Sequence, residues 1–298
     1  MVQLKQVALR LKSVKNIQKI TKTMKMVSAS KFTKAERELA SARPFGYGPR
    51  KFYESSRLVK VEKKDDTKGK EPTPEPVTEK PEEGKDPKKT KRLYVAVTSD
   101  RGLCGGVHSG VSRRVRRTLQ ERKGEVDTNR LVCIGDKSRA MLRRVFAQNM
   151  LVNVKDIGRI APVFADASTI AAAIVQSGYT YDVGEIYYNK YFTPVKYEMT
   201  VIPFFNKYKI VAAPNMNAFD DVDEDDLESY SEWTFAALLF YTLKESAASE
   251  QSARMAAMDN ATKNAEDMMR KLTLLFNRTR QAVITRELIE IISGAAAL

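Results

Sequence analysis

The residues whose types could form a binding or catalytic site gather in one turn, Thr98-Ser99-Asp100-Arg101-Gly102-Leu103-Cys104-Gly105-Gly106. The turn follows a strand-like run and precedes a helix-like one, where free backbone amides can hold a phosphate group. It lacks the lysine and hydroxyl that end a P-loop, and its glycines do not follow the G-x-G-x-x-G spacing. We therefore interpret Gly102, Gly105 and Gly106 as residues of a tight structural turn, with nucleotide binding as the alternative, and expect no cofactor.

The chain contains few residues that could support covalent catalysis or bind a metal ion. Cys104 and His108 lie four residues apart and could act as a nucleophile and its base, but no third group is placed to orient the imidazole. One histidine and two cysteines, the second being Cys133, are too few for a zinc site or a disulfide framework. The acids between Phe219 and Glu232 lack the pattern of a calcium loop. We expect no catalytic residue and no metal site.

The net charge indicates acidic partners. Lys and Arg number 51 against 37 Asp and Glu, a net charge of +14, which suits nucleic acid, anionic membrane or acidic protein surfaces. The basic run 113–123 could contact phosphate, but it lacks the interleaved aromatic residues of single-strand binders. The longest uncharged stretch, Ala167 to Tyr181, is too short to cross a bilayer, so we expect no membrane span.

The first 35 residues hold nine Lys or Arg and no acid, and they predict a long amphipathic helix. Its apolar residues form a narrow stripe that is typical of a coiled-coil seam, namely Leu4, Val7, Leu11, Val14, Ile17, Ile20, Met24 and Val27. The shortened spacing between Val14 and Ile20 predicts a stammer. A mitochondrial targeting peptide and a solvated surface helix are the alternatives, but the pattern continues for about 40 residues, longer than an import signal. Pro44, Gly46, Gly48 and Pro49 then favour a kink or a stop.

Composition divides the rest of the chain. After an N-terminal helix at 1–58, residues 59–92 are charged and rich in proline, which predicts a disordered insertion. Residues 93–218 alternate strand and helix patterns, which predicts a Rossmann-like α/β domain with a mostly parallel sheet. Residues 219–298 contain no proline and predict a helix from about Leu227 to Ser293. We expect it to coil against the N-terminal helix through Ala261, Ala265, Met268, Leu272 and Leu275.

Three separated motifs resemble, in the same order, the gamma subunit of F-type ATP synthases. They are the opening stretch from Leu9 to Val27, the turn from Ser99 to Gly106 and the final stretch from Ile284 to Ala295. The resemblance spans Val2 to about Tyr53 and Arg92 to Leu298. It implies an α/β fold class, in which an antiparallel coiled coil of the two terminal helices joins a central Rossmann-like domain.

The resemblance also implies a function and its partners. The chain would be a non-catalytic rotor shaft that couples rotation of a membrane ring of c subunits to ATP synthesis or hydrolysis on the beta subunits. Its partners would be the alpha and beta subunits, the delta and epsilon central-stalk subunits and the c ring. Its place would be the matrix side of the mitochondrial inner membrane, as a peripheral subunit. Residues that match contact or coupling positions of the family are Met24, Lys25, Arg254, Arg280, Gln281, Thr285 and Glu287.

A protein of another class would share the same charge. A basic coiled-coil protein that binds nucleic acid is the alternative function, and steep salt dependence of binding to duplex DNA would identify it. An enzyme with Cys104 as its nucleophile is a third hypothesis, which alkylation of the thiols would test.

Overall fold

The computed structural model of the chain describes residues 2–60, 75–76, 90–122, 128–216, 219 and 222–296. It contains two compact units. The helical unit consists of residues 1–30 and 254–298, and the sheet unit consists of residues 31–253.

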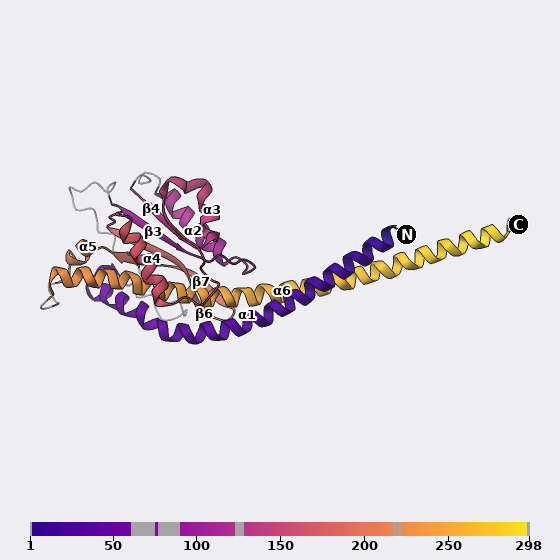
Figure 1. Cartoon of the computed structure of the whole chain (residues 1–298), viewed down its shortest axis with the longest axis horizontal. Helices are drawn as coiled ribbons and strands as arrows, with labels where there is room; N and C mark the ends of the chain where they lie inside the picture. Colours follow the sequence, from indigo (N-terminus) through magenta and orange to yellow (C-terminus); the bar gives the residue numbers. More distant parts are fainter. Residues whose placement is uncertain are drawn as a thin grey trace. The chain divides into compact units, whose positions relative to one another are not determined.

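Two long helices, α1 (Val2–Ser55) and α6 (Glu224–Ala296), each contribute residues to both units (Figure 1). The predicted C-terminal helix is confirmed, with an end about three residues beyond each predicted limit. The predicted kink or stop in the N-terminal helix is wrong as a stop, because α1 contains both Pro44 and Pro49 and continues to Ser55. Buried side chains on both sides of the prolines, such as Leu39 and Tyr53, hold this segment helical through packing, which outweighs the missing amide hydrogens.

The sheet unit is built on five strands in the order β5-β4-β3-β6-β7. The first four are parallel to one another, and β7 pairs with β6 in the antiparallel direction, so the prediction of a mostly parallel sheet is confirmed. The central strands are buried on both faces, which is why they read as continuous apolar runs in the sequence. The strands are β3 (Arg92–Val97), β4 (Arg130–Ile134), β5 (Met150–Val154), β6 (Val183–Thr193) and β7 (Lys196–Phe205).

Helices cover both faces of this sheet (Figure 1). On one face α2 (Val107–Glu121) and α3 (Asp136–Phe146) pack against alternate residues of β3 such as Tyr94. On the other face α4 (Phe164–Gln176) and the part of α6 within the sheet unit pack against the intervening residues such as Val95. Two short helices, η3 (Ala147–Asn149) and α5 (Lys207–Val211), complete the unit. Alternation of side chains across each strand therefore produces two cores.

The segment 59–92, which we predicted to be disordered, lies mostly outside the described residues. Its described part includes two short strands, β1 (Val59–Lys60) and β2 (Glu75–Pro76), which pair in the antiparallel direction. Among the helices that the structure describes, none is both long and apolar enough to cross a membrane.

Within the sheet unit, α1 and α6 approach closely at Gly46. A Cβ atom on Gly46 would lie 2.5 Å from ring atoms of Tyr241 on α6, whose side chain is fully buried. The position therefore requires glycine for lack of space, even though glycine lowers helix propensity.

We expect Gly46→Ala to destabilise the chain by about 1–3 kcal/mol, because the methyl group must displace a fully packed ring. Gly48→Ala is the matched control two residues along the same helix, where an added Cβ meets nothing within 4 Å. That control should be neutral or stabilising by up to about 1 kcal/mol through helix propensity. Thermal unfolding of the two variants, followed by circular dichroism, measures the difference, and equal midpoints would contradict the packing argument.

Candidate functional site

The glycine-rich turn after β3 uses its polar groups to hold neighbouring segments of the sheet unit together. Asp100 Oδ1 accepts a hydrogen bond from the Asp136 amide at the start of α3, at 2.6 Å. Gly105 has a φ of +62°, which favours glycine, whereas Gly106 flanks α2 with a φ of −93°. No positive φ occurs at Gly102. The hydrogen bond of Asp100 and the backbone conformation of Gly105 fit the interpretation of the turn as a structural one.

The structure also places the two residues of the hypothetical nucleophilic pair. His108 Nε2 lies 3.2 Å from Ser99 Oγ and 3.1 Å from the Arg101 carbonyl oxygen, so the turn itself engages this ring nitrogen. The Cys104 side chain is 2% exposed and packs against Val107. The cavity beside His108 has a volume of about 20 Å³, which is room for a water-sized molecule.

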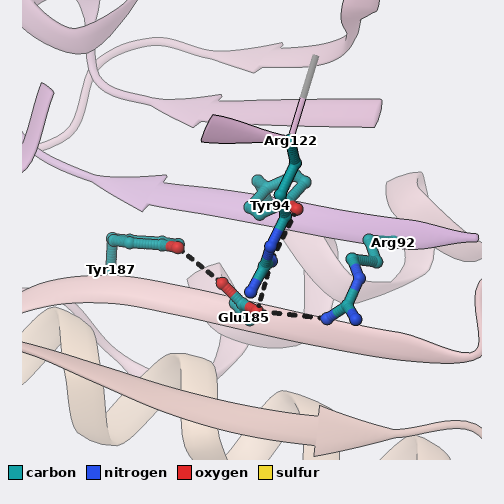
Figure 2. Close-up of polar contacts among 5 residues, drawn as sticks. All are labelled: Arg92, Tyr94, Arg122, Glu185 and Tyr187. Carbon is teal, nitrogen blue, oxygen red and sulfur yellow. Dashed lines mark hydrogen bonds and ion pairs between the residues drawn. The ribbon is translucent and has the colours of Figure 1, made fainter. Parts of the chain in front are cut away.

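A buried ionic cluster joins Arg122, the residue that follows α2, to strands β3 and β6 (Figure 2). The Glu185 carboxylate accepts from Arg122 Nη1 at 2.9 Å and from Tyr187 Oη at 2.5 Å, and it lies 3.5 Å from Arg92 Nη1. Arg122 Nη1 also donates to Tyr94 Oη at 2.8 Å. Burial, together with the charge of Glu185, raises the pKa of Tyr187, so its hydroxyl remains a donor. The cluster is a structural tie within the sheet unit.

The helical unit shows a regular seam along α1 that differs from the predicted stripe. After Val14 the least exposed positions of the helical unit's part of α1 carry polar side chains, and the spacing alternates 3-4 without a break, so the predicted stammer is wrong. Ile17, Ile20 and Val27, which we placed in the seam, are 52%, 58% and 52% exposed. The observed seam consists of Leu4, Val7, Leu11, Val14, Gln18, Thr21, Lys25 and Ser28.

The seam of α6 is also offset from the prediction. Ala265 is buried and Ala261 and Leu272 are half-buried, as expected, but Met268 and Leu275 are 45% and 48% exposed. The residues that follow them, Met269 and Phe276, are half-buried instead. The observed seam is Met258, Thr262, Ala265, Met269, Leu272 and Phe276, which again alternates 4-3. At both positions the adjacent residue is also a large apolar one, so apolar character could not decide which of the two faces inward.

Three side-chain pairs connect the two helices at consecutive seam positions, and we call them the polar layers. Gln18 Nε2 donates to Glu266 Oε1 at 3.1 Å, and Thr262 Oγ1 donates to Thr21 Oγ1 at 2.8 Å. Lys25 Nζ lies 2.5 Å from Asp259 Oδ1.

The third polar layer has an additional cation. Lys263 Nζ lies 2.9 Å from the other carboxylate oxygen of Asp259. Hydrogen bonds from Lys25 and Lys263 lower the pKa of Asp259, so the carboxylate stays ionised. Glu266 and Asp259 were missed in the sequence because a search for apolar periodicity does not consider acidic residues. Continuing the 3-4 spacing of Leu4, Val7 and Leu11 along α1 would have indicated their partners, Gln18 and Lys25.

The predicted site residues occupy different parts of the chain. Met24 is half-buried beside Lys25, and Arg254 is buried near the start of the helical unit's part of α6. The others are exposed on α6, more than 20 residues beyond Asp259 and therefore about 30 Å along the helix. They are Arg280, Gln281, Thr285 and Glu287. Every residue from 284 to 296 is exposed, including several large apolar ones.

Comparison with known proteins identifies the family. A family model described as ATP synthase matches residues 3–298. The chain is 49% identical over 298 residues to the mitochondrial ATP synthase subunit gamma of Drosophila melanogaster, covering 100% of this chain and 91% of the relative. The chain belongs to the gamma-subunit family of ATP synthases. A second gamma relative, from the mitochondrial F(1) complex of Rattus norvegicus, is 48% identical over 295 residues, with 99% of each protein covered.

Solved structures agree with this gamma assignment. A chain of the Tetrahymena thermophila mitochondrial ATP synthase central stalk and c ring matches with a TM-score of 0.62 and 27% identity, over 81% of this chain and 99% of that one. A chain of the Euglena gracilis OSCP/F1/c-ring assembly has a TM-score of 0.72 at 20% identity, over 99% and 94% of the two chains, and shows the fold. The expected family and fold class are thus confirmed, and these comparisons give no support to the nucleic-acid alternative.

For the ionic cluster we expect Glu185→Gln to lower the free energy of unfolding by about 2–4 kcal/mol, because two half-buried arginines lose their buried counter-charge. Glu121→Gln is the control: its carboxylate is 58% exposed and pairs with Arg117 at 2.8 Å, so it should change stability by less than about 1 kcal/mol. Denaturant unfolding of both variants measures the two values. A loss in Glu185→Gln no larger than in the control would show that the cluster contributes no specific stability.

Proposed function

We propose that this gamma-family chain is the rotating shaft that couples a membrane rotor ring to ATP synthesis or hydrolysis. The observation that carries the proposal is the family match over nearly the whole chain, with the two named gamma relatives covered over 91% and 99% of their own lengths. Catalysis takes place on the beta subunits, and the chain is a non-catalytic subunit of the complex.

The proposed partners follow from the assemblies in which its structural neighbours occur. The Tetrahymena neighbour belongs to a central stalk with a c ring, and the Euglena neighbour to an assembly of OSCP, F1 and c ring. This chain accordingly takes the alpha and beta subunits, the delta and epsilon stalk subunits and the c ring as partners. Its location is the matrix side of the mitochondrial inner membrane, as a peripheral subunit.

The helical unit has the properties that transmission of torque requires. Two helices joined by a regular seam resist twisting better than one, because turning either helix displaces knobs from the holes of the other. The polar layers add directional contacts at three consecutive seam positions. On the far part of α6, exposed apolar side chains such as Leu288, Ile289 and Ile292 offer a surface to a surrounding partner.

The predicted site residues that could contact surrounding subunits lie on both long helices, four of them on the exposed part of α6 and Lys25 on α1. Arg280, Gln281 and Glu287 are exposed polar residues on α6, available to partner side chains. Thr285 is exposed too, although its hydroxyl donates to the Gln281 carbonyl at 2.9 Å. Lys25 already pairs with Asp259, so any contact that it makes with a surrounding subunit is made by a cation that Asp259 partly neutralises.

A direct test of the function is reconstitution of the complex in vesicles with and without this chain. With the chain, ATP hydrolysis should acidify the vesicles through the ring. Without it, any remaining hydrolysis should be uncoupled from proton movement. Proton pumping that is unaffected by omission of the chain would contradict the shaft role.

For the exposed residues we expect Arg280→Ala, Gln281→Ala and Thr285→Val each to slow steady-state ATP hydrolysis of the reconstituted complex about 5- to 150-fold at normal assembly. The reason is the loss of about 1–3 kcal/mol of a contact made only at certain rotary angles. Arg278→Ala, an exposed arginine on the same helix, is the control and should leave turnover unchanged. Turnover measured beside the assembled fraction separates the cases, and normal rates in all three variants would remove the coupling role.

A further inference from the structure

Helix α1 carries two parallel stripes in the helical unit, and the less apolar one faces α6. The inner stripe contains Gln18, Thr21, Lys25 and Ser28. The outer stripe consists of the residues that come one position earlier, namely Ile17, Ile20, Met24 and Val27. Adjacent residues differ by about 100° around a helix axis. A rotation of α1 by one residue would therefore exchange the two stripes.

Between residues 17 and 27, hydrophobic burial alone would favour that exchange, whereas it opposes the exchange at Leu4, Val7, Leu11 and Val14, which lie on the inner stripe. Each buried apolar side chain contributes favourably in proportion to its buried area, whereas Ile17, Ile20 and Val27 each keep about half of their surface exposed. The observed orientation must consequently be held by interactions that depend on direction as well as on area.

The polar layers supply such interactions. Three consecutive seam positions of α1 each have a specific partner on α6, with donor–acceptor distances of 3.1, 2.8 and 2.5 Å. Rotation of this segment by one residue would separate all three pairs, and the Thr262 hydroxyl would keep only its hydrogen bond to the Met258 carbonyl oxygen of its own helix, at 2.8 Å. A single polar residue in a seam can fix the register of a coiled coil, and here there are three pairs.

We propose that Gln18, Thr21 and Lys25 are positioning residues that fix the rotation of α1 about its own axis between residues 17 and 28, where apolar burial does not favour the observed face. They keep Ile17, Ile20 and Val27 exposed to the subunits that surround the shaft. The second statement rests on the proposed function. The first concerns the chain alone and is tested without the complex.

The experiment uses the full chain and reads the orientation from thiol labelling at two adjacent positions outside the polar layers. Val27→Cys replaces a residue that is 52% exposed, and Ser28→Cys replaces one that is 3% exposed. With intact polar layers, a fluorescent maleimide should label the first on the order of tenfold faster than the second. The native thiols, Cys104 and Cys133, are buried and give the background rate.

Each labelling variant is then combined with a mismatch or with its repair. Gln18→Glu with Lys25→Asp places carboxylates opposite Glu266 and Asp259, and it should reduce the ratio of the two labelling rates to about one or below. Adding Glu266→Gln and Asp259→Lys restores complementary pairs and should restore the original ratio.

The control carries the same charge changes on exposed positions of the same helix, Asn16→Glu with Lys22→Asp, and should leave the ratio unchanged. A ratio that the mismatch does not alter, or alters no more than the control does, overturns the proposal. If the mismatch separates the helices, both positions label fast and helix content falls by circular dichroism. The repaired variant then decides, because failure to recover the ratio also overturns it. Failure of the shaft function would appear in the reconstituted complex instead and would leave these labelling rates as they are.

Discussion

The seven-residue repeat of α1 is the constraint on which the rest of the structure depends. The buried and half-buried seam positions alternate 3-4 along its part of the helical unit, from Leu4 to Ser28, and the same alternation continues in the sheet unit through Phe32, Leu39 and Tyr53. One helix thus serves a coiled coil in one unit and a globular core in the other. Because the repeat decides which face is inside, it also decides which residues remain outside for partners.

Polar residues in this seam favour specificity over stability. Replacing a buried ion pair by well-packed apolar side chains is often neutral or stabilising, so the pair of Lys25 and Asp259 is not explained as a source of stability. Uniform apolar seams, in contrast, permit alternative registers. The same reasoning applies to Glu185, whose two arginines come from segments distant in sequence and so join α2, β3 and β6 in one arrangement.

The sequence was sufficient for features that depend on one local property. The buried run from Leu93 to Val97 predicted a strand of a parallel sheet, and the absence of proline after Pro214 predicted a helix of unusual length. It was insufficient where either of two faces of one helix could form the seam, as at Ile17 and Ile20. The hydrophobic pattern of one helix contains no information about polar partners on another helix. The partners of Glu185 could not be predicted either, since residues 92, 122 and 185 meet only after folding. The exposed candidates on α6 came from family resemblance alone.

The unbroken seam of α1 limits how the length of this helix can change in evolution. Inserting or deleting one residue near Val14 would turn everything before it by about 100° and shift it by 1.5 Å relative to α6. Insertions or deletions of seven residues keep both faces of the helix in place. Those of three or four residues come close to a complete turn and can be absorbed by local overwinding or unwinding. Among gamma relatives, gaps in sequence alignments should therefore avoid this helix, and length should vary where no second helix has to be matched.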